Sequence, residues 1–113
     1  MNRTRQEIFD LAWNGLKAQG FGKSRVPGKA RCLYRGPDGL KCAIGHCIPD
    51  GNYRKKFDRG MELGGVLHAA RISDADYDFA RGLQEAHDFA AAPADMVARL
   101  CAFAVAHSLI IPS

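Results

Sequence analysis

The segment from residue 32 to residue 50 concentrates the side chains that could do chemistry. It contains three of the four cysteines in the chain and one of the four histidines. Zinc binds four thiolate or imidazole ligands in a tetrahedron, so these side chains form a candidate metal site. The Cys-x-x-Cys pair typical of zinc knuckles is absent, however, and we favour the competing interpretation that reduced thiols pack in the core. The candidate metal ligands are Cys32, Cys42, His46 and Cys47.

A catalytic thiol would need a second group of residues, because a cysteine nucleophile requires a base and a group that orients the base. His87 and Asp88 could supply these two functions to Cys42 or Cys32. Adjacent residues on one helix point about 100° apart, so we expect Asp88 to align His87 poorly. His87 also follows Leu83 by about one helical turn, which favours a histidine at the edge of the core.

Basic and aromatic side chains alternate around the same segment, and they form the candidate binding surface. Such a mixture suits a single-stranded nucleic acid or an acidic protein partner. Arg and Tyr are also residue types that anchor many protein interfaces. No helix-turn-helix, zinc-finger or RNA-recognition motif accompanies them. The candidate binding residues are Arg31, Tyr34, Arg35, Lys41, Tyr53, Arg54, Lys55 and Lys56.

The charges are distributed unevenly along the chain. Residues 1–59 contain thirteen Lys and Arg against five Asp and Glu, whereas residues 60–113 contain three against seven. A basic half attracts nucleic acid or an acidic protein surface. No apolar run approaches the roughly 18 residues that cross a membrane, and the polar N-terminus lacks a secretory pattern. We therefore expect a cytoplasmic protein with reduced cysteines and no membrane partner.

The first element that must position these side chains is a helix over about residues 4–19. Thr4 and Glu7 form a capping-box pattern at its start, and apolar residues recur behind them at helical spacing. The basic segment over residues 21–31 contains Gly and Pro, which indicates a loop. This loop would carry the chain from the helix to the cysteine-rich segment.

A β-hairpin is predicted next. Residues 36–39, Gly-Pro-Asp-Gly, are typical of a type I turn followed by a left-handed glycine. With a three-residue loop, Tyr34 would pair with Cys42 and Cys32 with Ile44, all on one face. A two-residue turn would shift the register and place the two cysteines on opposite faces.

Helices are predicted for the C-terminal half. Periodic apolar residues indicate a short helix over 63–70, and a longer helix over about 74–91 that Ser73 caps. Pro93 opens a last helix that is apolar almost all round, so we expect it to be the most buried element. We therefore predict a single α+β domain over residues 1–113, in which a small antiparallel β-hairpin packs against about four helices.

Two motifs carry a resemblance to a known group of proteins. One is Cys-x-Tyr-Arg-Gly-Pro-Asp-Gly-Leu-Lys-Cys-Ala-Ile-Gly from Cys32, followed by Ile-Pro-Asp, and the other is Leu-Gln-x-x-His-Asp over 83–88. In order and spacing they resemble small uncharacterised proteins of phage and prophage genomes, over roughly residues 5–109. This chain departs from many of those relatives at His46-Cys47. The resemblance implies a phage-associated accessory protein and brings no enzymatic activity.

These observations favour non-covalent binding over catalysis. We expect an accessory protein, in the cytoplasm of the host cell, that inhibits or modulates a host protein complex such as a defence system. Nucleic-acid binding through the basic half is the first alternative. A Cys/His-dependent hydrolase or transferase that uses Cys42, His87 and Asp88 is the second. We expect no cofactor.

Overall fold

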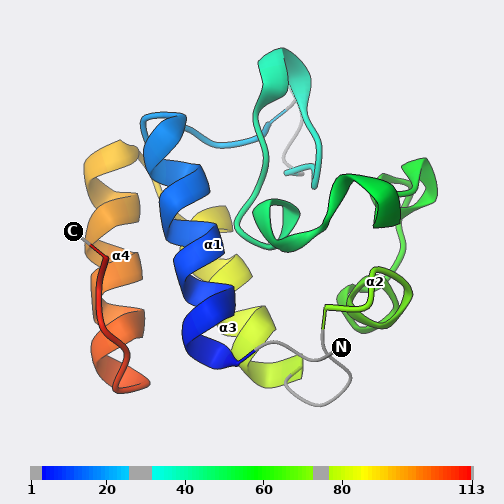
Figure 1. The fold of residues 1–113 in the computed structure, drawn as a ribbon. Helices are drawn as coiled ribbons and strands as arrows, with labels where there is room; N and C mark the ends of the chain where they lie inside the picture. The colour runs from blue at the N-terminus through cyan, green and yellow to red at the C-terminus, as the bar shows by residue number, and fades with distance from the viewer. Residues whose placement is uncertain (1–3, 26–31, 73–76, 113) are drawn as a thin grey trace.

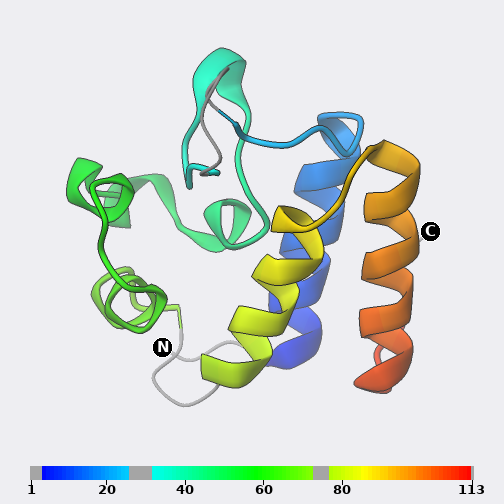
Figure 2. The ribbon, with the colours of Figure 1, turned by 180° about the vertical axis from the view of Figure 1, so that it is seen from behind.

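The computed structural model describes residues 4–25, 32–72 and 77–112, which fold as an assembly of helices (Figure 1). Three of the α-helices, α1, α3 and α4, lie side by side, and the remaining helix and the 3-10 turns form a second group beside them (Figures 1 and 2). The α-helices are α1 (Arg5–Ala18), α2 (Leu63–Ala69), α3 (Tyr77–Asp88) and α4 (Pro93–Ala106). The 3-10 turns are η1 (Pro37–Gly39), η2 (Ile44–Cys47), η3 (Asp50–Asn52) and η4 (Lys55–Asp58).

Helix α1 begins with the predicted capping box. The Thr4 hydroxyl accepts from Glu7 N at 3.1 Å, and Thr4 N donates to Glu7 Oε1 at 2.8 Å, so two amides that the helix cannot pair are satisfied. The helix ends before Gly20, which has a φ of 66° that favours glycine. One face of α1 is fully buried and packs against η2, through Ile8, Phe9, Ala12, Trp13 and Leu16.

The predicted α+β class is wrong, because the described residues contain no β-sheet. The turn at 36–39 does form, closed by a 2.8 Å bond from Gly36 N to Leu40 O, and Gly39 is left-handed with a φ of 74°. Asp38 also has a positive φ of 58°, which a type I turn does not allow. Within the described residues, the only bridge between extended segments is isolated and joins Arg25 to Cys32.

Side chains take the hydrogen bonds that a hairpin would need. Tyr34 N donates to Asp58 Oδ1 at 2.7 Å instead of to a facing strand. Lys41 N donates to Gln19 Oε1 at 3.1 Å, and Ile44 N donates to a glutamine of α3. The chain then turns into η2 instead of continuing as a strand, so neither predicted hairpin register exists.

The C-terminal helices match the prediction better. Helix α2 lies within the expected range, and Pro93 occupies the first turn of α4. Helix α3 lies inside the predicted 74–91 range, although the predicted cap Ser73 falls outside the described residues. The expectation that α4 is the most buried element is wrong. It packs mainly on α3 at the edge of the molecule, and Val105 on its outer face is 75% exposed.

Two parts of the cysteine-rich segment, at Tyr34 and at Gly45, have their backbones in close contact. A Cβ on Gly45 would lie 2.2 Å from the Tyr34 carbonyl oxygen, so only glycine fits there without movement. Gly15 on α1 likewise leaves room for the ring of His46. None of the helices among the described residues has both the length and the apolar character that a membrane span requires.

Candidate functional site

Both sequence motifs meet at one pocket of about 160 Å³. The cysteine-rich segment and the Leu-Gln-x-x-His-Asp motif are more than 30 residues apart in the chain, yet each lines this pocket. A third segment, from Phe57 in η4 to Met61, closes the remaining side of the pocket. The lining residues are Cys32, Tyr34 and Cys42 from the first motif, Gln84 and Asp88 from α3, and Phe57, Asp58, Gly60 and Met61 from the third segment.

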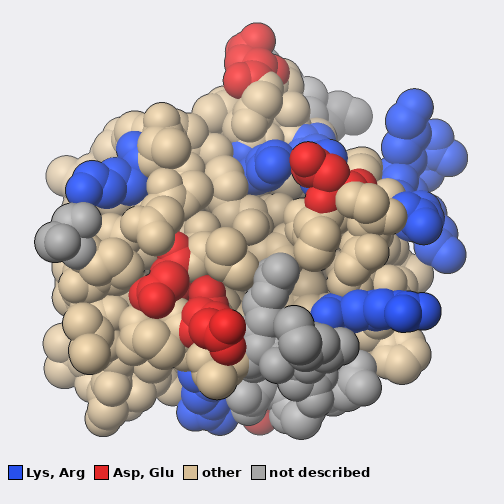
Figure 3. All heavy atoms as spheres, viewed as in Figure 1, with Lys and Arg blue, Asp and Glu red and all other residues tan. Residues whose placement is uncertain are grey.

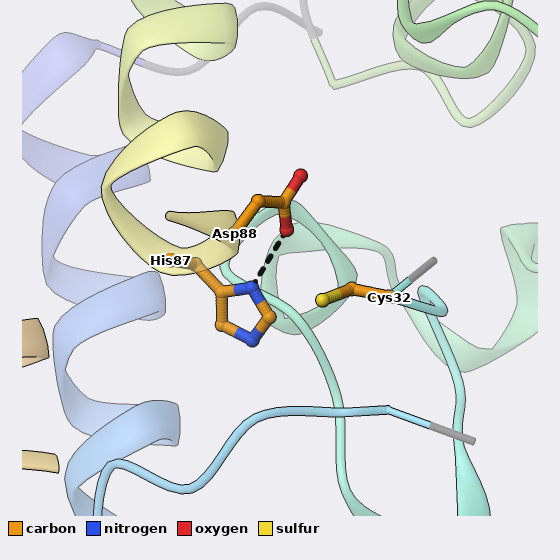
Figure 4. Close-up of side chains that lie close together, drawn as sticks. All are labelled: Cys32, His87 and Asp88. Atoms are coloured by element: carbon orange, nitrogen blue, oxygen red, sulfur yellow. Dashed lines mark hydrogen bonds and ion pairs between the residues drawn. The ribbon is translucent and has the colours of Figure 1, made fainter. Parts of the chain in front are cut away.

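Three side chains beside the pocket form a compact cluster. Each of Cys32, His87 and Asp88 offers a metal-ligating atom, and these atoms lie within 4.8 Å of one another. Figure 4 shows the Cys32 sulfur and the Asp88 carboxylate both directed toward the imidazole of His87. Among the described residues this is the one group of three or more Cys, His, Asp or Glu with such spacing.

The expectation that Asp88 aligns His87 poorly is wrong. His87 Nδ1 lies 2.8 Å from Asp88 Oδ1, although the two residues are adjacent on α3. Asp88 is the last residue of the helix, and Gln84 Nε2 also donates to its Oδ1 at 2.8 Å. The carboxylate is therefore held back over the preceding residue, a geometry that residue spacing on an ideal helix does not predict.

The contacts around this pair are supplied by segments distant in the sequence. Gln84 Oε1 accepts from Ile44 N at 3.0 Å, which ties α3 to η2. Lys23 Nζ donates to the main-chain oxygens of Asp88 and Ala90 at 2.7 and 2.8 Å. A cation at the last carbonyls of a helix is stabilising, and here it also fixes the backbone that carries Asp88.

His87 is fully buried, and among the described residues one of its ring nitrogens has no hydrogen-bond partner. A carboxylate only accepts, so Nδ1 donates in the bond to Asp88. Within the described part of the chain, Nε2 is buried and without a hydrogen bond. An unsatisfied buried polar atom costs about 1–3 kcal/mol, so such atoms often mark functional sites.

The thiol of Cys32 is a poor nucleophile in this arrangement. Burial raises its pKa to about 11, and the charge and hydrogen bond of Asp88 act in the same direction against smaller effects of Lys23 and Arg25. The thiol is therefore protonated near neutral pH, whereas nucleophilic attack requires the thiolate. Burial also raises the pKa of Cys42, whose sulfur accepts from Gly45 N at 3.3 Å.

The other predicted metal ligands serve the packing of α1. His46 Nε2 donates to Gln19 Oε1 at 2.9 Å, and burial, followed by the charge of Lys41, lowers the His46 pKa to about 4. Cys47 Sγ donates to Ile8 O at 3.4 Å and is 1% exposed. In the described structure these two residues do not join Cys32 in a metal-ligating cluster.

Several predicted binding residues hold the loops together instead of projecting freely. The Arg35 guanidinium lies 4.5 Å from the centre of the Tyr53 ring and binds Asp50 Oδ1 at 2.5 Å. Asp58 accepts from Tyr34 N, from Arg35 N at 3.3 Å and from the Tyr53 hydroxyl at 2.6 Å. Burial raises the pKa of Tyr53 to about 12, so the hydroxyl stays protonated and donates.

The remaining basic candidates differ in exposure. Lys41 is half-buried. Arg54 is exposed, and its Nη1 donates to Gly51 O at 3.0 Å. The side chains of Arg54, Lys55 and Lys56 are exposed, and Figure 3 shows Lys and Arg gathered along the edge formed by η3 and η4. Arg31 lies outside the described residues.

Sequence reasoning did not single out three residues that organise the site, Gln84, Asp58 and Lys23. Gln84 belongs to the Leu-Gln-x-x-His-Asp motif, so the motif itself was a usable signal. Asp58 and Lys23 lie in segments without periodicity or a recognised motif, and only their contacts in the fold identify them.

The chain matches no family model, no curated protein and no solved structure. The resemblance to phage proteins and the expected host partner therefore remain predictions.

Proposed function

We propose that this protein binds one divalent metal ion, zinc in particular, through Cys32, His87 and Asp88. The observation that carries the proposal is the meeting of these three ligand groups within 4.8 Å. They come from two segments that are distant in the sequence. In the metal-free protein, hydrogen bonds to Asp88 hold the other two residues in place. Upon binding through His87 Nδ1, the nitrogen that faces Asp88, the cation would replace two protons: the thiol proton is released to solvent, and the imidazole proton moves to Nε2.

The ligand set favours zinc over harder cations. Zinc accepts thiolate sulfur, imidazole nitrogen and carboxylate oxygen together, whereas magnesium and calcium prefer oxygen ligands. Three protein ligands are also typical of zinc sites that keep one position open, because structural sites usually have four. Cys32 and Asp88 line the pocket, so the open position would face it.

The neighbouring residues support the cluster as a metal site. Metal-ligating side chains are commonly oriented by further hydrogen bonds. Here Gln84 orients the Asp88 carboxylate, and Lys23 holds the backbone of the same residue. Thiolate catalysis has weaker support, because the Cys32 pKa is raised and the ring of His87 is fully buried.

Isothermal titration of the metal-free protein with zinc tests the proposal. We expect one site per chain with a dissociation constant below about 1 µM, and at least 100-fold weaker binding in Cys32→Ala, which removes a direct ligand. Cys101→Ala is the matched control, since Cys101 is also half-buried but lies on α4. Absence of zinc binding at micromolar concentration, or equal loss in both variants, would refute the proposal.

An anionic partner at the edge of η4 is a second candidate. The exposure of Arg54, Lys55 and Lys56 beside the Arg35–Tyr53 stack supports it. Fluorescence anisotropy with a labelled single-stranded oligonucleotide measures the dependence of affinity on salt. Replacing the three exposed cations by Ser should reduce the slope of log K against log salt by about 2, since each phosphate contact contributes about 0.7. An unchanged slope would exclude these residues from nucleic-acid contact.

A further inference from the structure

The pocket beside the proposed metal site is lined by both polar and apolar side chains. Cys32 and Asp88, two of the proposed metal ligands, are among the polar ones. Phe57, which is 1% exposed, and the half-buried Met61 are among the apolar ones. A ligand that coordinates the metal and also contacts these two residues would meet a phenyl ring and a thioether, both of which favour apolar or aromatic groups.

The charge of the lining residues argues against phosphate ligands. Two of the described lining residues are aspartates, Asp58 and Asp88, and none is Lys or Arg. Zinc with one thiolate and one carboxylate has no net charge, so Asp58 supplies the remaining formal charge among the described lining residues. Phosphate recognition normally requires Arg, Lys or several free backbone amides. The pocket therefore suits a ligand with no charge or with a single negative charge on the metal-binding group.

The size of the pocket limits the part of a ligand that it can enclose. A volume of about 160 Å³ is close to that of a cavity of about 150 Å³ that binds one benzene molecule. A nucleotide, with a base, a sugar and a phosphate, exceeds this volume. We infer that the pocket takes a small organic molecule with a single ring, which coordinates the metal at one end and contacts Phe57 and Met61 with the other. This inference rests on the proposed function.

Cobalt provides a spectroscopic test, because Co²⁺ occupies zinc sites and its visible absorption reports each added ligand. The probes are acetohydroxamate, benzohydroxamate and 2-naphthohydroxamate, which share a metal-binding group and differ in apolar size. We expect benzohydroxamate to bind the cobalt protein about tenfold more tightly than acetohydroxamate, because its ring buries apolar surface. The second ring of 2-naphthohydroxamate should raise the affinity by less than a further threefold, since this ring extends beyond the pocket.

Two variants locate the ring. In Met61→Ala the tenfold advantage of benzohydroxamate should fall below threefold, whereas Leu11→Ala, on the exposed face of α1, should retain it. If cobalt does not bind, the proposed function fails and this inference fails with it. If cobalt binds but the three probes have equal affinity, or Met61→Ala leaves the advantage intact, the inference alone is overturned.

Discussion

The side-chain amide of Gln84 donates to Asp88 Oδ1 across 2.8 Å, one turn further along α3. Its oxygen accepts from Ile44 N at 3.0 Å, so one residue connects the second motif to the first. This connection positions the carboxylate that the proposed metal site uses.

Gln84→Met keeps the length of the side chain and removes both hydrogen bonds. We expect zinc affinity to fall about tenfold, because the Asp88 carboxylate loses an orienting donor. We also expect the free energy of unfolding to fall by about 1–3 kcal/mol, since the Ile44 amide loses its acceptor. Gln6→Met removes comparable bonds to Ile110 far from the pocket and should leave zinc affinity unchanged. Equal affinities in the two variants would contradict the role of Gln84.

The stability of the fold should depend on the titration of His46. Its pKa is lowered to about 4 from an ordinary value of 6.5, chiefly by burial and then by Lys41 and His87. The unfolded chain binds a proton between these values and the folded chain does not. Stability is therefore fully present above pH 6.5 and is lost as the pH falls toward 4.

The loss should amount to about 1–2 kcal/mol, after allowance for the partial exposure of the ring. His46→Gln keeps a donor for Gln19 and removes the titration. Urea unfolding at pH 7.5 and pH 4.5 should show a smaller decrease for this variant than for the parent protein. Identical decreases would show that His46 does not contribute to acid sensitivity.

Asp58 should be a major determinant of stability in the cysteine-rich segment. Asp58→Asn replaces one acceptor oxygen by a donor, although Tyr34 N, Arg35 N and the Tyr53 hydroxyl all donate to this side chain. We expect a loss of about 2–3 kcal/mol in thermal or urea unfolding. Asp38→Asn is the control: Asp38 is exposed, and asparagine tolerates its positive φ, so stability should change by less than about 0.5 kcal/mol.

Gly45 should not tolerate a side chain. In Gly45→Ala the new methyl group would lie 2.2 Å from the Tyr34 carbonyl oxygen, so the backbone must shift. We expect destabilisation by about 2–4 kcal/mol, measured by urea unfolding. Gly51→Ala meets no atom within 4 Å and should be neutral or slightly stabilising. A Gly45→Ala protein as stable as the parent would contradict the close packing of this segment.

Local sequence patterns predicted the helices because each pattern has a local physical cause. The Thr4–Glu7 capping box and Pro93 in the first turn of α4 are examples. The hairpin prediction failed because its competitors are distant in sequence. Asp58 and Gln84 take the amides that strand pairing would have used, and no local pattern reports that competition.

The candidate site was predictable only in part. The residue types predict a candidate catalytic group that includes Cys32, His87 and Asp88. The predicted metal ligands, in contrast, all lie within residues 32–47. His46 and Cys47 belong to η2 and face α1, where the His46 ring lies against Gly15 and Cys47 Sγ donates to Ile8 O. The pairing of His87 with Asp88 depends on the end of α3, where the carboxylate can fold back.

X-ray absorption at the zinc edge of the loaded protein tests the central claim most directly. Coordination by Cys32, His87 and Asp88 predicts one sulfur at about 2.3 Å, with nitrogen and oxygen ligands at about 2.0–2.2 Å. The sulfur contribution should disappear in Cys32→Ala and persist in Cys101→Ala. A first shell without sulfur in the parent protein, or one with two or more sulfur ligands, would contradict the proposed site.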